Sequence, residues 1–140
     1  MRAFLFTSAS GWIATLLVAG EVLLPYLLRR SRLSVWLGIA EGFAQPYLVR
    51  MWPHYWAGYM LLALALAHAW VPMQAGYARH ANATGLWMAT AAFVALLLQV
   101  VLGFALQDTK LTTRATVRRW HYWLMVAIVG GVAVHIWLNR

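Results

Sequence analysis

The chain has 140 residues, of which 64% are hydrophobic and 10% are charged, whereas soluble domains carry about 25% charged residues. Eleven Lys and Arg residues oppose three acidic residues, which gives a formal net charge of +8. This composition excludes an ordinary soluble domain and favours a small integral membrane protein. The basic residues lie at the ends of apolar runs, as topology signals do, so we do not expect nucleic acid as a partner.

The chain contains no cysteine. This excludes disulfide bonds, thiolate metal sites, cysteine-held iron–sulfur clusters and covalent attachment of a c-type haem. Any haem in this protein must therefore be bound non-covalently, with histidine or methionine as the iron ligand.

Four apolar segments are long enough to cross a membrane as helices. They are residues 3–28, 54–72, 85–106 and 120–138. Arginines that begin at Arg29 are expected to stop the first span, and Pro72 is expected to stop the second. Pro53 is a favourable first position for the second helix. Because short loops join the spans, residues 1–140 are predicted to form one domain, an all-α transmembrane bundle of four helices with up-down-up-down topology.

Residues 31–50, between the first and second spans, have an ambiguous pattern. Apolar residues between Leu33 and Leu48 recur at helical spacing, and Glu41 and Gln45 fall on the opposite face. We predict an amphipathic helix that lies in the membrane interface. The alternative is a fifth span, which would place the two termini on opposite sides of the membrane.

The distribution of Lys and Arg predicts the orientation of the bundle. The side with both termini holds Arg2, Arg79 and Arg140, and the other side holds Arg29, Arg30, Arg32, Arg50, Lys110, Arg114, Arg118 and Arg119. The more basic side is expected to face the cytoplasm, with both termini on the periplasmic side of a prokaryotic cytoplasmic membrane. Tryptophans are expected at both interfaces: Trp52, Trp56, Trp120 and Trp123 inside, and Trp12, Trp70, Trp87 and Trp137 outside.

Two of the predicted spans carry a pair of histidines fourteen positions apart. His54 and His68 lie in the second span, and His121 and His135 lie in the fourth. Fourteen residues make two heptads, so the histidines of a pair share nearly the same helix face, about 21 Å apart along the axis. In parallel helices, His54 then faces His121 at an inner level, and His68 faces His135 at an outer level. The fifth histidine, His80, falls in a predicted loop and is expected to be solvated.

Two facing imidazoles at each of two levels are what two bis-histidine haems require. Haem brings four ring nitrogens to the iron, whereas a zinc or copper site would need further ligands, and we expect no carboxylate or cysteine nearby. Histidines that only hydrogen-bond between helices are the other interpretation. Because polar residues inside a membrane are costly, four at matched depths indicate function. We therefore predict two non-covalent haem b groups with these four histidines as axial ligands.

Small and basic residues near the histidines are further candidates. Gly58, Gly103 and Gly131 would give a porphyrin flat room, although close helix packing through small residues explains each of them equally well. Arg50, Arg118 and Arg119 at the inner level, and Arg79 at the outer level, would neutralise haem propionates. Topology signals and lipid headgroup contacts are the alternative explanation for these arginines.

Glu21 is an acidic residue inside the first predicted span, about two turns before its cytoplasmic end. As a functional group it would accept a proton or bind a quinone hydroxyl. As a structural group it would pair with a loop arginine or reach the interface. Gln99 in the third span is open to the same two interpretations.

Two spans that each carry the motif H-x13-H, with one span between them, resemble the N-terminal haem bundle of cytochrome b in quinol–cytochrome c oxidoreductases. In that family the second and fourth helices hold both haems, and glycines on the first and third helices make room for them. Ala89 and Gly103 match the third helix in part. The predicted orientation resembles the ferric-reductase-like transmembrane family, and the length resembles small four-span bacterial cytochromes b.

The resemblance implies electron transfer through two haems, as a cytochrome b subunit of a respiratory or photosynthetic complex linked to the quinone pool. The partners it implies are the other subunits, a dehydrogenase or cytochrome c, quinone and the lipid bilayer. We expect an electron-transfer subunit rather than a complete enzyme. Two alternatives stay open: a stand-alone haem b oxidoreductase, either ferric-reductase-like or a superoxide oxidase, and a non-haem membrane anchor or metal-binding bundle.

Overall fold

A computed structural model describes residues 2–30, 51–76, 81–108 and 110–139, with side chains in the first of these ranges described for residues 8–23. The described chain is all-α and has four helices. They are α1 (Arg2–Arg30), α4 (Trp52–Gln74), α5 (Ala83–Ala105) and α6 (Arg114–Leu138). The predicted interfacial helix at 31–50 lies outside the described residues.

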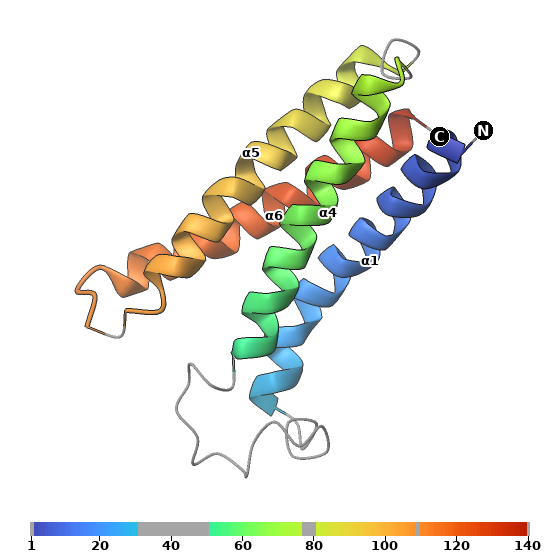
Figure 1. The fold of residues 1–140 in the computed structure, drawn as a ribbon. Helices are drawn as coiled ribbons and strands as arrows, with labels where there is room; N and C mark the ends of the chain where they lie inside the picture. Colours follow the sequence, from blue (N-terminus) through green and yellow to red (C-terminus); the bar gives the residue numbers. More distant parts are fainter. Residues whose placement is uncertain (1, 31–50, 77–80, 109, 140) are drawn as a thin grey trace.

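The four helices form two antiparallel pairs, α1 with α4 and α5 with α6 (Figure 1). Smaller contacts, mainly α4 with α5 and α1 with α6, join one pair to the other. The pairs diverge towards the end where α4 begins and α5 ends, and both chain termini lie at the opposite end (Figure 1). As a result α4 and α6 run in the same direction, as the predicted topology requires.

Three of these helices, α4, α5 and α6, are long and apolar enough to cross a membrane. In α1 the apolar stretch within the described side chains, Ser8–Leu23, is shorter. The all-α fold is therefore confirmed, and three of the four predicted spans are helices that could cross a membrane, whereas a span through α1 stays a prediction.

Most helix ends lie within two residues of the predicted ends, and two of the differences concern the proline in α4 and the start of α6. The prediction that Pro72 stops the second span is wrong, because α4 continues through it to Gln74. Proline removes one backbone donor, but the helix continues past it, and the Ala75 N–H donates to the Val71 carbonyl at 3.0 Å. Helix α6 starts at Arg114, six residues before the predicted start at Trp120. The predicted start lies where the apolar run begins, but the residues before it include arginine and alanine, which favour a helix.

An apolar core lies midway between the two histidine levels. Its buried members are Leu61, Ala95, Leu96 and Ile128, and Ala14, Leu17 and Val18 of α1 pack against them. Leu61 is seven residues from both His54 and His68, and Ile128 is seven residues from both His121 and His135. The residue halfway between the two histidines of each helix is therefore a buried apolar side chain.

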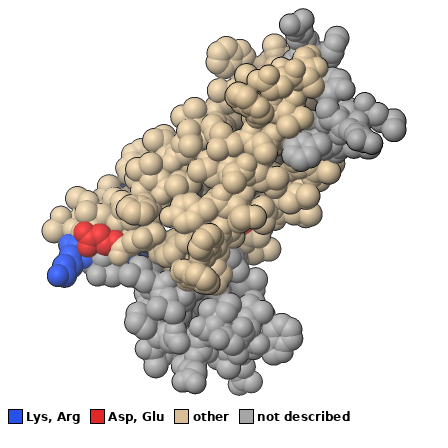
Figure 2. Space-filling model, viewed as in Figure 1, with Lys and Arg blue, Asp and Glu red and all other residues tan. Residues whose placement is uncertain are grey.

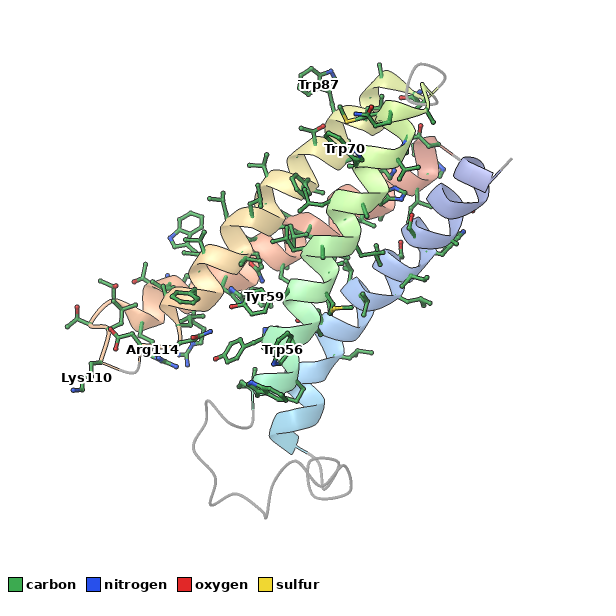
Figure 3. All side chains as sticks on the ribbon, in the orientation of Figure 1. Trp56, Tyr59, Trp70, Trp87, Lys110 and Arg114 are labelled. Carbon is green, nitrogen blue, oxygen red and sulfur yellow. The ribbon has the colours of Figure 1, made fainter. Side chains whose placement is uncertain are left out.

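On the face shown in the space-filling view, the described surface is largely uncharged, and most of the blue and red atoms lie at one end (Figure 2). Lys110 and Arg114 lie at that end, whereas Trp70 and Trp87 lie at the opposite end (Figure 3). All eight tryptophans predicted for the two interfaces are exposed. Exposed tryptophans and clustered charges at the ends of apolar helices are typical of a surface that faces lipid.

Single cysteines test the orientation directly, because the chain has none of its own. Thr84, at the start of α5, and Thr112, in the α5–α6 connection, are both exposed and lie at opposite ends of the bundle. We expect a membrane-impermeant maleimide to label Thr84→Cys in intact cells and Thr112→Cys only after the membrane is opened. The reverse pattern would invert the predicted orientation, and labelling of both from one side would show that α5 does not cross the membrane.

Candidate functional site

The structure brings the four histidines together in the two predicted pairs. The ring centroids of His54 and His121 are 6.2 Å apart with the rings at 78°. Those of His68 and His135 are 6.5 Å apart with the rings at 87°. Because α4 and α6 are parallel and carry the same spacing, each helix supplies one imidazole to each level.

The centroid separations at both levels are close to the separation of two imidazoles on opposite sides of one metal ion. Bonds from a metal to an imidazole nitrogen are about 2.0–2.1 Å long. Since a ring centroid lies about 1.1 Å behind the bonding nitrogen, two imidazoles on opposite sides of one ion have centroids roughly 6.3 Å apart. The observed values, 6.2 and 6.5 Å, lie on either side of that distance.

The histidines of α4 are held by groups on α1. His54 Nδ1 makes an ion-pair contact with Glu21 Oε2, and both side chains are largely buried. His68 Nδ1 shares a hydrogen bond with the Ser10 hydroxyl at 3.2 Å. Histidines that bind metals usually donate their second ring N–H to such a partner, which fixes the tautomer and leaves Nε2 for the metal. The expectation that neither level has a carboxylate nearby is therefore wrong for the inner level.

The histidines of α6 lie against α5 instead. His135 Nδ1 donates to the Gly85 carbonyl at 3.0 Å. His121 Nδ1 is buried without a hydrogen-bond partner in the described part of the chain, and a Cβ on Gly103 would lie 3.4 Å from the His121 Cε1. Each histidine helix is thus supported by its own antiparallel neighbour, α4 by α1 and α6 by α5.

Glycines on the supporting helices make this close approach possible. A Cβ on Gly11 of α1 would come within 2.9 Å of His68 Cε1, which a real side chain could not occupy without a shift. Gly103 has the corresponding place beside His121 on α5. These two glycines therefore give room to the imidazoles themselves.

Asn139 connects the outer level to the ends of two helices. Its amide nitrogen donates to the His135 carbonyl at 3.0 Å, and its Oδ1 accepts the Asn82 N–H at 2.9 Å. Asn82 is the N-cap of α5 and accepts the Gly85 N–H at 3.0 Å. The chain of bonds from Asn139 through Asn82 to Gly85 fixes the carbonyl that orients His135.

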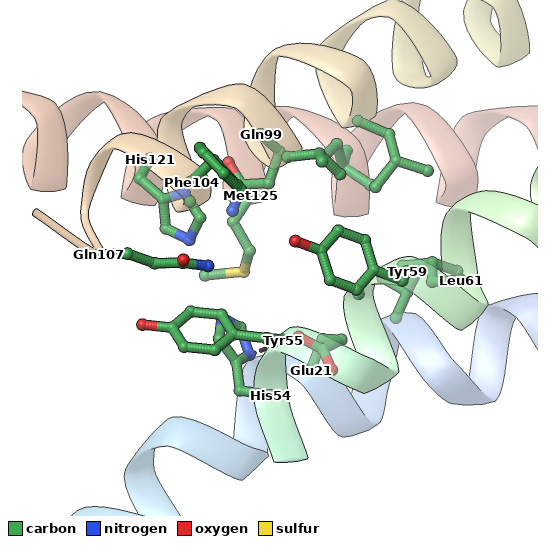
Figure 4. Close-up of a pocket in the computed structure, with 16 residues that line it drawn as sticks. Glu21, His54, Tyr55, Tyr59, Leu61, Gln99, Phe104, Gln107, His121 and Met125 are labelled. Carbon is green, nitrogen blue, oxygen red and sulfur yellow. Dashed lines mark ion pairs between the residues drawn. The ribbon is translucent and has the colours of Figure 1, made fainter. Parts of the chain in front are cut away.

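A pocket opens between the helix pairs at the inner level (Figure 4). All four helices line it, and His54 and His121 contribute from opposite helix pairs. It is partly open to the outside, and its cavity volume of about 80 Å³ is well below the roughly 300–1,000 Å³ of pockets that enclose a drug-sized ligand. Two acceptors in it, Glu21 Oε1 and Gln99 Oε1, are buried without a hydrogen-bond partner in the described part of the chain. Buried polar atoms of this kind indicate a missing partner.

The remaining predicted residues have different surroundings. Gly58 and Gly103 line the pocket, and a Cβ on Gly58 would meet open space. Gly131 lies in the α5–α6 interface, where a Cβ would come within 2.9 Å of Ala92 Cβ. Arg118 and Arg119 are exposed on α6, within one turn of His121. Arg50 and Arg79 lie outside the described residues.

Sequence analysis did not predict several polar groups of the site. They are Ser10, Gly85, Asn139, Tyr59 and Gln107. Ser10 and Gly85 could have been sought as residues on the neighbouring helices at the depth of the outer histidines. Nothing in the sequence marks Tyr59, within α4, or Gln107, just after α5, as residues that line the pocket.

The fold and the site define a class: an all-α protein of four helices, three of them candidate membrane spans, with two levels of facing histidines. Neither a protein-family model, nor a curated protein, nor a solved structure matches the chain.

Proposed function

We propose that this chain is a membrane cytochrome that binds two b haems and moves electrons one at a time between the inner and outer levels. The observation that carries the proposal is the pair of facing imidazoles at each level, with centroid separations of 6.2 and 6.5 Å. Both values fit one metal ion held on two sides. Repetition of the arrangement at two depths supports a relay rather than a single binding site.

Haem suits these levels better than a bare metal ion. Among the described residues there is no group of three or more His, Cys, Asp or Glu side chains that could hold a metal ion. Zinc and copper sites need three or four protein ligands. Haem needs only two axial ligands from the protein, since the porphyrin supplies four.

In this proposal the residues at and between the two levels have separate roles. When bound, haem supplies one-electron chemistry. The histidines bind the irons, and Glu21, Ser10 and the Gly85 carbonyl orient three of the four rings. The apolar core between the levels excludes water. Arg118 and Arg119, which are exposed on α6 within one turn of His121, would neutralise propionates at the inner level.

We further propose that the inner level exchanges electrons with the quinone pool, as a subunit of a membrane redox complex. The support is chemical: Glu21 Oε1 and Gln99 Oε1 are buried acceptors that line the inner pocket and lack a donor in the described part of the chain. A quinol presents two hydroxyl donors to such groups.

The experiment that tests the proposal is a haem measurement on the purified full chain. A reduced-minus-oxidised visible spectrum and a pyridine haemochrome assay should give two b haems per chain. A protein that is colourless after expression with adequate haem supply would overturn the proposal. In that case the histidines would have to be explained as a non-haem bundle or as helix packing.

A further inference from the structure

The two histidine levels differ in the charge of the group that supports them. At the inner level, His54 contacts the carboxylate of Glu21. At the outer level, His68 contacts a hydroxyl and His135 a backbone carbonyl, and both groups are neutral. The two levels therefore have the same ligands in unequal electrostatic surroundings.

A carboxylate on the second nitrogen of an axial histidine has a known direction of effect. A negative charge beside this nitrogen makes the imidazole a better electron donor to the metal, and the effect of a neutral hydroxyl or carbonyl is smaller. A more strongly donating ligand stabilises the oxidised, more positive iron, so it lowers the reduction potential.

The positive charges of the described arginines near the inner level have a weaker effect on the reduction potential than the Glu21 carboxylate. Arg118 and Arg119 are exposed on α6, where water, lipid headgroups and salt screen them. The Glu21 side chain is 12% exposed and contacts the ligand itself. Among the charged side chains that the structure describes, the Glu21 carboxylate is the one in contact with a proposed axial ligand.

From this asymmetry we infer that Glu21 is a positioning residue that makes the inner haem the lower-potential haem, so that electrons pass downhill from the inner to the outer level. In that step the inner iron loses one electron and the outer iron gains one, with no bond made or broken. The inference rests on the proposed function, because it needs a haem at each level.

Redox titration of the purified holoprotein, followed by its visible spectrum, tests the inference. Two midpoints are expected, and variants His121→Ala and His68→Ala assign them, because each should retain one haem. Glu21→Gln should raise the inner midpoint by the equivalent of at least a tenfold change in equilibrium constant, about 59 mV for one electron, and should leave the outer midpoint in place. Ser10→Ala is the matched control, which should leave the inner midpoint unchanged.

A second variant keeps the inference testable if Glu21→Gln folds poorly. Ser10→Asp brings a carboxylate to His68 and should lower the outer midpoint potential. The difference between the two midpoints would then become smaller because the higher one falls. An unchanged inner midpoint in Glu21→Gln, or a wild-type inner midpoint above the outer one, would overturn the inference. Loss of the inner haem from both Glu21→Gln and Glu21→Asp would also overturn it, since Glu21 would then retain the ligand rather than set the potential. Two bound haems with any of these results would leave the proposed function standing, whereas absence of haem would remove both.

Discussion

Substituting His121 by alanine is expected to remove one of the two haems from each chain and to leave the spectrum of the other unchanged. The inner and outer pairs are about 21 Å apart along the helices, and each iron would lose one of only two protein ligands when its pair is broken. The haemochrome assay should fall from two haems per chain to one. Electron transfer across reconstituted vesicles should fall to background, because a single remaining level does not reach both faces.

The matched substitution His68→Ala should remove the other haem, so the two variants should give complementary difference spectra. His80→Ala is the control, because His80 is the one histidine outside the two pairs and should be dispensable for haem binding. Retention of two haems in either paired variant would contradict the assignment of ligands. Loss of both haems from a single variant that still folds would contradict the independence of the two levels.

The second large effect is expected for Gly131→Leu, in the interface between α5 and α6. A Cβ at this position would lie 2.9 Å from Ala92 Cβ and 3.4 Å from the Met88 carbonyl, so the helices would have to separate. Overpacking of a close interface typically costs about 1–3 kcal/mol, and we expect a value near the upper end because backbone as well as side chain is in the way. The free energy of unfolding in mixed detergent micelles measures the loss.

Gly130→Leu is the matched control for this prediction. The neighbouring glycine is exposed, and a Cβ there would meet nothing within 4 Å. The substitution should change the free energy of unfolding little, because an exposed leucine on this helix faces the same apolar surroundings as its neighbours. Equal destabilisation by both substitutions would show that the effect comes from glycine replacement in the helix rather than from the α5–α6 contact.

The pairing of the histidines could be predicted from sequence because it depends on spacing alone. Two parallel helices with the same fourteen-residue step must bring their histidines to equal depths once one pair is aligned. The contact of Glu21 with His54 could not be predicted in this way. Helix α1 is apolar on most of its surface, so no hydrophobic stripe shows which face turns towards α4. Its rotation is set by packing, through contacts such as that of Gly11 with His68.

The sequence could also not predict which neighbour each glycine would face. Gly131 precedes His135 by one turn, and its sequence position fitted both room for a porphyrin and close helix packing; in the structure it packs against Ala92 of α5. Neighbouring positions on a helix differ by about 100° in direction, so a small change in helix rotation decides whether a glycine faces a cofactor site or another helix. The late end of α4 was not visible in the sequence either, because Pro72 removes one backbone donor but the helix continues two residues past it.

The apolar layer around Leu61 and Ile128 has an electrical consequence if haems occupy the two levels as proposed. An electron that moves between them crosses about 21 Å of a hydrocarbon core about 30 Å thick, and this layer gives no polar route for a proton to follow. Moving one charge through the full membrane field corresponds to about 2.3 kcal/mol per 100 mV, so this step corresponds to roughly 1.6 kcal/mol per 100 mV. Electron flow from the inner to the outer level would then discharge an inside-negative membrane potential, and the potential itself would drive the transfer.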